Sequence, residues 1–137
     1  MKVELPPVLE SLIATLTSQC GWILDQGLIS GPFGDLALTL RYDNLRMRLV
    51  RDRDQWFIEF SEKSLPSEWY DPALIKEVLT GSIGQDVLSL DQQVTIVAKD
   101  WPKVVELFRG DRAESTHFFL TQHRLERARR RMPELFK

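Results

Sequence analysis

Reactive and metal-ligating residues are scarce in this chain of 137 residues. Its one cysteine, Cys20, excludes an intramolecular disulfide and a cysteine-rich zinc knuckle. The two histidines, His117 and His123, lie six residues apart. On one helix they would point about 120° away from each other, so they cannot form the i, i+4 pair of a zinc-binding helix. We therefore expect no specific metal and no cofactor.

Sequence motifs of common enzyme classes are also missing. The chain has no G-x-S-x-G nucleophile elbow, no phosphate-binding P-loop and no H-E-x-x-H zinc motif. Cys20 has no histidine near it in the sequence, and we interpret it as a small buried hydrophobe rather than a nucleophile. Each histidine is expected to be a surface residue or a hydrogen-bonded structural residue. These absences favour a chain that is not an enzyme.

No long uninterrupted apolar run occurs. The first twenty residues contain charged side chains and lack the pattern of a signal peptide or a membrane span, so we expect a cytoplasmic protein without membrane contact. The apolar and charged fractions, 43% and 28%, are those of an ordinary globular protein. A chain of this length is expected to form one domain, residues 1–137.

The most informative segments are three alternating stretches between residues 36 and 61. In Leu36–Tyr42, Arg46–Arg51 and Gln55–Ser61, apolar residues recur at every second position, as in strands with one buried face. Asp43-Asn44 and Asp52-Arg53-Asp54 join them with residues that favour tight turns. The pattern predicts an antiparallel meander. Its buried face would carry Leu36, Leu38, Leu40, Met47, Leu49, Trp56, Ile58 and Phe60.

Helical patterns lie on both sides of the meander. Apolar residues recur every three or four positions after Pro6-Pro7, which suits the first turn of a helix. Asp71-Pro72 combines a capping residue with a proline at the first helical position, and Gly81 is placed to end that helix. Leu88–Gly110 predicts two helices separated at Asp100–Pro102.

Other segments are less clearly defined. Val94–Val97 fits a helix or a fourth strand, Trp22–Leu24 a short strand or an extended link, and Ser64–Glu68 a loop. A basic helix is expected over about residues 113–132. Its candidate core contacts are Phe118, Phe119, Leu125, Ala128 and Met132. The predicted fold class is therefore α+β, with an antiparallel meander of about three or four strands packed against several α-helices.

Charge is distributed unevenly along the chain. From Arg109 onward there are eight basic and four acidic residues, a net charge of +4, whereas the preceding residues carry −6 of the total of −2. Such a basic segment is typical of an interaction tail. It is equally typical of a helix that docks on its own acidic body.

The polar face of the meander is the candidate binding surface. Arg41, Arg46 and Arg48 are expected on it together with Glu59, and pairing between arginine and Glu59 across strands explains these charges without a ligand. A basic sheet with an aromatic side chain also resembles surfaces that hold single-stranded nucleic acid. Trp69 is expected in a loop before a helix cap, as a packing residue or an interface anchor. These five residues form the predicted partner-binding site.

Four segments give the chain a resemblance to a known class of proteins. They are Leu40–Asn44, Val50–Trp56, Trp69–Pro72 and Asp100–Phe108. In residue character and order of elements, the stretch from Leu36 to Phe108 resembles small bacterial α+β proteins of the immunity-protein kind. Such proteins are found beside polymorphic or contact-dependent toxins and neutralise their cognate toxin. The resemblance implies a monomer or small homo-oligomer with one exposed face matched to a protein partner, and no catalytic residues.

Two functions follow as expectations. The first is a non-catalytic protein-binding module of the immunity type, whose partner is a toxin domain. The alternative is a nucleic-acid-binding or regulatory domain that uses the arginine-bearing sheet face or the basic C-terminal helix.

Overall fold

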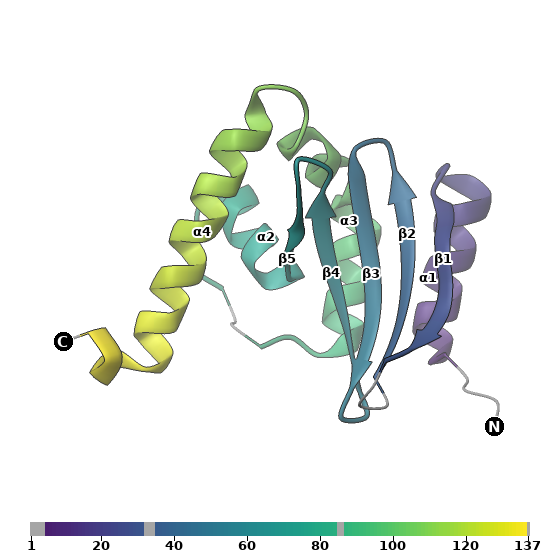
Figure 1. Cartoon of the computed structure of the whole chain (residues 1–137), viewed down its shortest axis with the longest axis horizontal. Helices are drawn as coiled ribbons and strands as arrows, with labels where there is room; N and C mark the ends of the chain where they lie inside the picture. Colours follow the sequence, from purple (N-terminus) through teal and green to yellow (C-terminus); the bar gives the residue numbers. More distant parts are fainter. Residues whose placement is uncertain (1–4, 32–34, 85–86, 137) are drawn as a thin grey trace.

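The computed structural model describes residues 5–31, 35–84 and 87–136, so both ends of the expected domain 1–137 lie outside the description. Five strands and four helices occupy these ranges (Figure 1). In chain order they are α1 (Pro7–Gln19), β1 (Ile23–Ser30), β2 (Leu36–Tyr42), β3 (Leu45–Asp52), β4 (Gln55–Glu62), β5 (Leu65–Tyr70), α2 (Pro72–Thr80), α3 (Leu90–Leu107) and α4 (Arg112–Arg131). A short 3₁₀ helix, Pro133–Phe136, follows α4.

The five strands form one antiparallel sheet in the order of the chain, β1-β2-β3-β4-β5. The predicted α+β class and the central meander are confirmed. Positive φ angles at Asp43, Arg53 and Asp54 close the two central hairpins, as tight turns of this kind require. The sheet has one strand more than the upper expectation of four.

The additional strands lie at the two edges. β1 runs well beyond the predicted Trp22–Leu24 segment, and β5 occupies most of the predicted loop Ser64–Glu68, so the loop prediction was wrong. Every residue of β1 is exposed, so burial imposed no alternating pattern on its sequence. β5 contains Pro66, which a strand tolerates at an edge, where one backbone donor can be lost.

Helix predictions were partly correct. Asp71 caps α2 by accepting a hydrogen bond from the Leu74 backbone at 3.0 Å, and Gly81 ends it with φ of 72°. By contrast, α3 is one helix through Pro102, so the predicted break and the alternative strand at Val94–Val97 were wrong. Proline deprives the Ala98 carbonyl of its partner, but Ala98 is exposed and water can replace that bond. The buried stripe of α3 continues across the proline as Gln93, Ile96, Val97, Asp100, Val104, Val105 and Leu107.

The helices leave one face of the sheet uncovered. In Figure 1, α1 and α3 lie behind the strands, and the near face carries none of the described helices. The predicted inner face is buried, except that Trp56 is only half-buried against the core. We call the uncovered side the open face. It carries the alternate residues Ala37, Thr39, Arg41, Arg46, Arg48, Val50, Phe57, Glu59 and Ser61.

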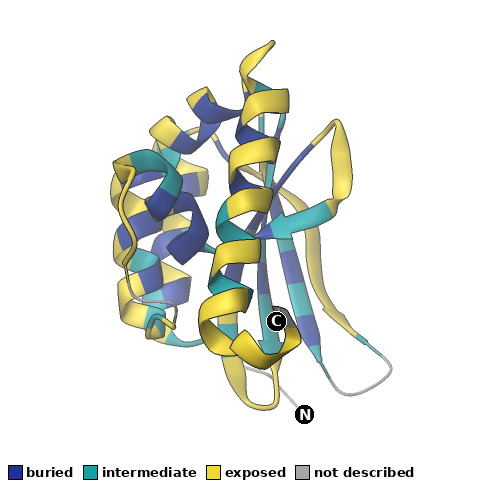
Figure 2. Ribbon diagram, turned by 90° about the vertical axis from the view of Figure 1, so that its left-hand side faces the viewer, coloured by how far each residue is buried: buried dark blue, intermediate teal, exposed yellow. Residues whose placement is uncertain are grey.

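Helix α4 stands along the edge of the sheet beyond β5 (Figure 2). Its predicted core contacts were wrong, because Phe118, Phe119, Leu125 and Met132 are exposed and Ala128 is only half-buried. The buried residues are Thr116, His117 and Leu120. α4 turns a largely polar side toward the protein, so hydrophobicity alone misidentified the buried side. No helix within the described ranges is long and apolar enough to cross a membrane.

Candidate functional site

The register of the strands arranges the open face in three rows. Across the sheet, the first row is apolar, the second pairs opposite charges, and the third places two arginines side by side. The rows are Ile29-Ala37-Val50-Phe57, Gln26-Thr39-Arg48-Glu59 and Ile23-Arg41-Arg46-Ser61. The predicted residues Arg41, Arg46, Arg48 and Glu59 therefore share this face.

Trp69 joins this group from β5. Its neighbour Tyr70 is buried on the helix side, so the alternation of the strand directs Trp69 to the open face. The Arg48 guanidinium carbon lies 4.1 Å from the centroid of the Trp69 ring, and that of Arg46 lies at 5.0 Å. Both distances are within cation–π range. Trp69 lies in a strand rather than in the predicted loop, and the arginines fix its orientation.

Polar contacts hold the arginines in place. Arg48 forms an ion pair with Glu59 at 2.9 Å. This is the cross-strand pairing of arginine with Glu59 expected from the sequence. Arg46 donates to the Pro66 carbonyl at 2.8 Å. Arg41 lies one strand farther from Trp69 and pairs with Asp25 of β1 at 3.4 Å. The structure thus joins four of the five predicted residues in one cluster and places Arg41 at its margin.

A groove of about 770 Å³ adjoins the open face beside the part of β4 that does not pair with β5. β5 pairs with β4 at Phe60 and Glu62, and the first half of β4 lines the groove. There the Ile58 amide donates to Gln93 Oε1 at 2.9 Å, and Gln93 Nε2 donates to the Leu88 carbonyl at 3.3 Å. A side-chain amide thus substitutes for the missing strand. Sequence reasoning missed Gln93, because its role depends on where α3 packs.

Basic residues of α4 bind acidic partners on the body of the protein. Arg124 donates to Glu68 at 3.1 Å and to the Trp69 carbonyl at 2.6 Å, which fixes the backbone of the partly exposed tryptophan. Two further arginines continue this face of the helix. Their contacts are Arg127 with Asp71 at 2.7 Å and Arg130 with Glu77 at 3.6 Å. Of the two alternatives for the basic helix, docking on its own acidic body is the one observed.

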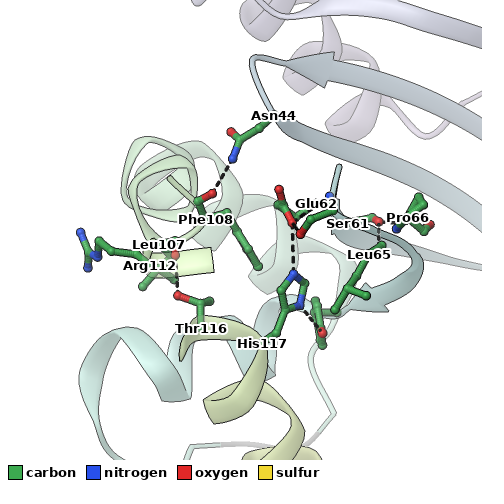
Figure 3. A network of polar contacts seen from close by, with 12 residues as sticks. Asn44, Ser61, Glu62, Leu65, Pro66, Leu107, Phe108, Arg112, Thr116 and His117 are labelled. Carbon is green, nitrogen blue, oxygen red and sulfur yellow. Dashed lines mark hydrogen bonds and ion pairs between the residues drawn. The ribbon is translucent and has the colours of Figure 1, made fainter. Parts of the chain in front are cut away.

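A buried polar network fastens α4 to the β4–β5 hairpin (Figure 3). His117 Nδ1 lies 2.7 Å from the Tyr70 hydroxyl, and His117 Nε2 lies 3.2 Å from Glu62 Oε2. Burial raises the pKa of Tyr70, so its hydroxyl stays protonated and donates to Nδ1. His117 then donates from Nε2 to the carboxylate, which also accepts from the backbone and side chain of Ser64. Both histidine nitrogens are therefore engaged in structural bonds.

This network does not have the geometry of a nucleophile and its base. Ser64 bonds the carboxylate rather than the imidazole, and His117 is only 7% exposed. Neither the groove beside β4 nor a second groove between α2 and α3 is lined by His117. His123 pairs with Glu77 at 3.0 Å. Among the described residues, no three His, Cys, Asp or Glu side chains gather in a group able to hold a metal ion.

Glu62 gives the network a predicted dependence on pH. Burial alone would raise its pKa, but hydrogen bonds from Ser64 and His117 together lower the pKa below the ordinary value of 4.5. A carboxylate with a lowered folded-state pKa stabilises the protein above its unfolded pKa, and this stabilisation is lost as pH falls through the folded value. Glu62→Gln should cost about 1–3 kcal/mol at pH 7, with the difference from wild type shrinking below about pH 4.5.

Urea denaturation between pH 7 and pH 3 measures this effect. The exposed Glu134→Gln variant in the short 3₁₀ helix after α4 is the control and should follow the wild type throughout. A difference for Glu62→Gln that stays constant down to pH 3 would contradict the assigned network.

Comparisons with models of protein families, with curated proteins and with solved structures give no significant match.

Proposed function

We propose that this chain is a non-catalytic protein-binding module and that the open face around Trp69 binds the partner. One observation carries the proposal: Trp69 is partly exposed and rests on the guanidinium groups of Arg46 and Arg48. Exposed tryptophan and arginine are the residues most enriched among energetically dominant interface positions. An aromatic ring already held in place loses little conformational freedom on binding.

Charge on the open face favours an acidic partner surface. Arg41 and Arg46 are direct cross-strand neighbours, an arrangement that disfavours the free sheet because like charges repel. Asp25 and the Pro66 carbonyl offset part of this repulsion. Carboxylates on a partner would offset more of it. The apolar row ending at Phe57 adjoins the groove, and burial of its exposed apolar surface by a partner would favour binding.

The immunity-type function is the specific form of this proposal. The partner would be a toxin domain, and binding of the toxin by the open face would neutralise it. The test is co-expression and pull-down with the product of the adjacent gene, followed by an assay of toxicity with and without the chain. A chain that turns over conventional substrates without such a partner would contradict the non-catalytic proposal.

Charge reversal on the open face should slow partner binding. Arg46→Glu is expected to reduce the association rate constant about tenfold at low salt, because reversing a charge on the binding face weakens the electrostatic steering of an acidic partner. Arg129→Glu on α4 changes the net charge equally, but Arg129 pairs with Glu126 at 2.8 Å and does not line the groove beside the open face. Stopped-flow or surface-based kinetics should show the loss for Arg46→Glu alone. Equal rates in both variants would remove the open face from the binding site.

Nucleic-acid binding is the second candidate, because an aromatic ring beside arginines also suits a single-stranded base. Arg124, Arg127 and Arg130 of α4, however, contact acidic groups of the protein itself. Oligonucleotide affinity that falls steeply with rising salt would favour this candidate over the protein partner.

A further inference from the structure

β1 is an exposed edge strand with an apolar sequence. It is the first strand of the sheet, and all eight of its residues are exposed. Its four large aliphatic residues are 40–51% exposed: Ile23, Leu24, Leu28 and Ile29. Natural edge strands are protected from pairing with another chain by lysine and other charges, by proline or by β-bulges, and of these β1 has no lysine or proline but does have two register irregularities. Its charged residue, Asp25, contacts Arg41 within the sheet.

The sequence of β1 is nearly palindromic about Gln26. It reads Ile23-Leu24-Asp25-Gln26-Gly27-Leu28-Ile29, with the same apolar residues at equal distances from the centre. Two copies paired antiparallel about Gln26 would set Ile23 opposite Ile29 and Leu24 opposite Leu28. Asp25 would meet Gly27 rather than another carboxylate. The strand is therefore complementary to a second copy of itself, as a two-fold interface requires.

The faces of the strand match in the same register. Ile23 pairs with Arg41 and Ile29 with Ala37, so both lie on the open face. Leu24 pairs with Leu40 on the helix side, and Leu28 lies within the irregular stretch between Gln26 and Ile29. The two register irregularities of β1 fall on either side of Gln26. Ile23 and Ile29 of the two copies would therefore meet on the same side of the sheet.

We propose that two copies of this chain associate through β1, with the two-fold axis at Gln26. The pairing would join two five-stranded sheets into one continuous sheet and cover both exposed edges. Because the two-fold axis of an antiparallel pair is perpendicular to the sheet, both open faces would lie on the same side. β-bulges also serve to protect an edge from pairing, and a monomer is the corresponding alternative. The free edge of β1 lies at the opposite end of the sheet from Trp69 of β5, so this inference does not depend on the proposed function.

The first experiment measures mass in solution. Light scattering after gel filtration, over about 1 μM to about 1 mM, should give twice the chain mass of 15.9 kDa at the upper concentrations. Leu28→Lys should return the mass to one chain, because it places a charge in the apolar part of the interface. Phe118→Lys is the matched control on α4, where the side chain is 59% exposed, and should remain dimeric. Wild type at the mass of one chain throughout, or equal masses for both variants, would overturn the proposal.

A second experiment tests the register. In a Cys20→Ser background, Gln26→Cys would place two thiols opposite each other across the axis, at a Cα separation that suits a disulfide. Mild oxidation should cross-link most of this variant into dimers. Ser30→Cys lies at the end of β1 and has no cysteine opposite it in this register, so it should remain uncross-linked. Equal cross-linking of the two variants would overturn the Gln26-centred pairing.

Discussion

Replacing Ile58 with alanine should lower the free energy of unfolding by about 2–5 kcal/mol. Ile58 is fully buried, lies opposite Leu49 in the sheet, and faces the covering helices. Truncation removes apolar contacts and leaves a cavity that the surrounding strands can fill only in part. Small domains are stable by about 5–15 kcal/mol, so the change is a large fraction of the total. Urea denaturation with an unchanged m-value would measure it.

Phe57 is the matched control for this prediction. It is the adjacent residue on β4 but points to the open face and is 39% exposed. Phe57→Ala should therefore change stability by less than about 1 kcal/mol. A slip of one residue in the pairing of β4 would exchange the two faces of the strand. A larger loss of stability for Phe57→Ala than for Ile58→Ala would therefore show that β4 is shifted by one residue.

The sequence predicts the central part of the fold because several local signals agree there. Alternation in β2, β3 and β4 reflects one buried and one open face, and the two tight turns fix the register between them. Helix α2 has a capping residue, a proline and a terminal glycine in the expected positions. Each of these features acts over a few residues, so a single sequence is enough to identify it.

The parts that were predicted wrongly depend on tertiary contacts. β1 and β5 are edge strands without an alternating pattern, and their pairing follows from the central hairpins. α3 continues through Pro102 because the same side of the helix is buried before and after the proline. α4 docks through charged and hydrogen-bonding groups, so its apolar residues Phe118 and Phe119 remain exposed. None of these contacts is encoded by residues close in sequence.

The candidate site also combines features set by residues close in sequence with features set by tertiary contacts. Placement of Arg46, Arg48 and Glu59 on one face follows from the period of two alone. The position of Trp69 required knowledge that β5 is a strand and that it leaves β4 after Tyr70. Arg124, which bonds the Trp69 carbonyl, lies 55 residues farther along the chain. The alternation that places Arg46, Arg48 and Glu59 on the open face can be seen in the sequence alone. The hydrogen bond that Arg124 donates to Trp69 joins residues far apart in the chain and cannot.

Replacing Trp69 with alanine should weaken partner binding about 30-fold or more, which corresponds to roughly 2 kcal/mol. The ring is the large aromatic group of the cluster and lies against the Arg46 and Arg48 guanidiniums. Its loss removes contact area and frees both arginines to move, which raises the entropic cost of binding. The effect should appear mainly as faster dissociation, since mutants of one interface differ chiefly in that rate.

Two controls separate this loss of binding from loss of structure. Trp69→Ala retains the backbone carbonyl that accepts from Arg124, so the free energy of unfolding should fall by only about 1–2 kcal/mol, the strength of two exposed cation–π contacts. Trp69→Phe keeps a ring above the arginines and should lose less affinity than the alanine variant. Kinetics are measured with the partner captured by the wild-type chain. An unchanged dissociation rate in Trp69→Ala, with the fold intact by urea denaturation, would exclude Trp69 as the anchor of the interface.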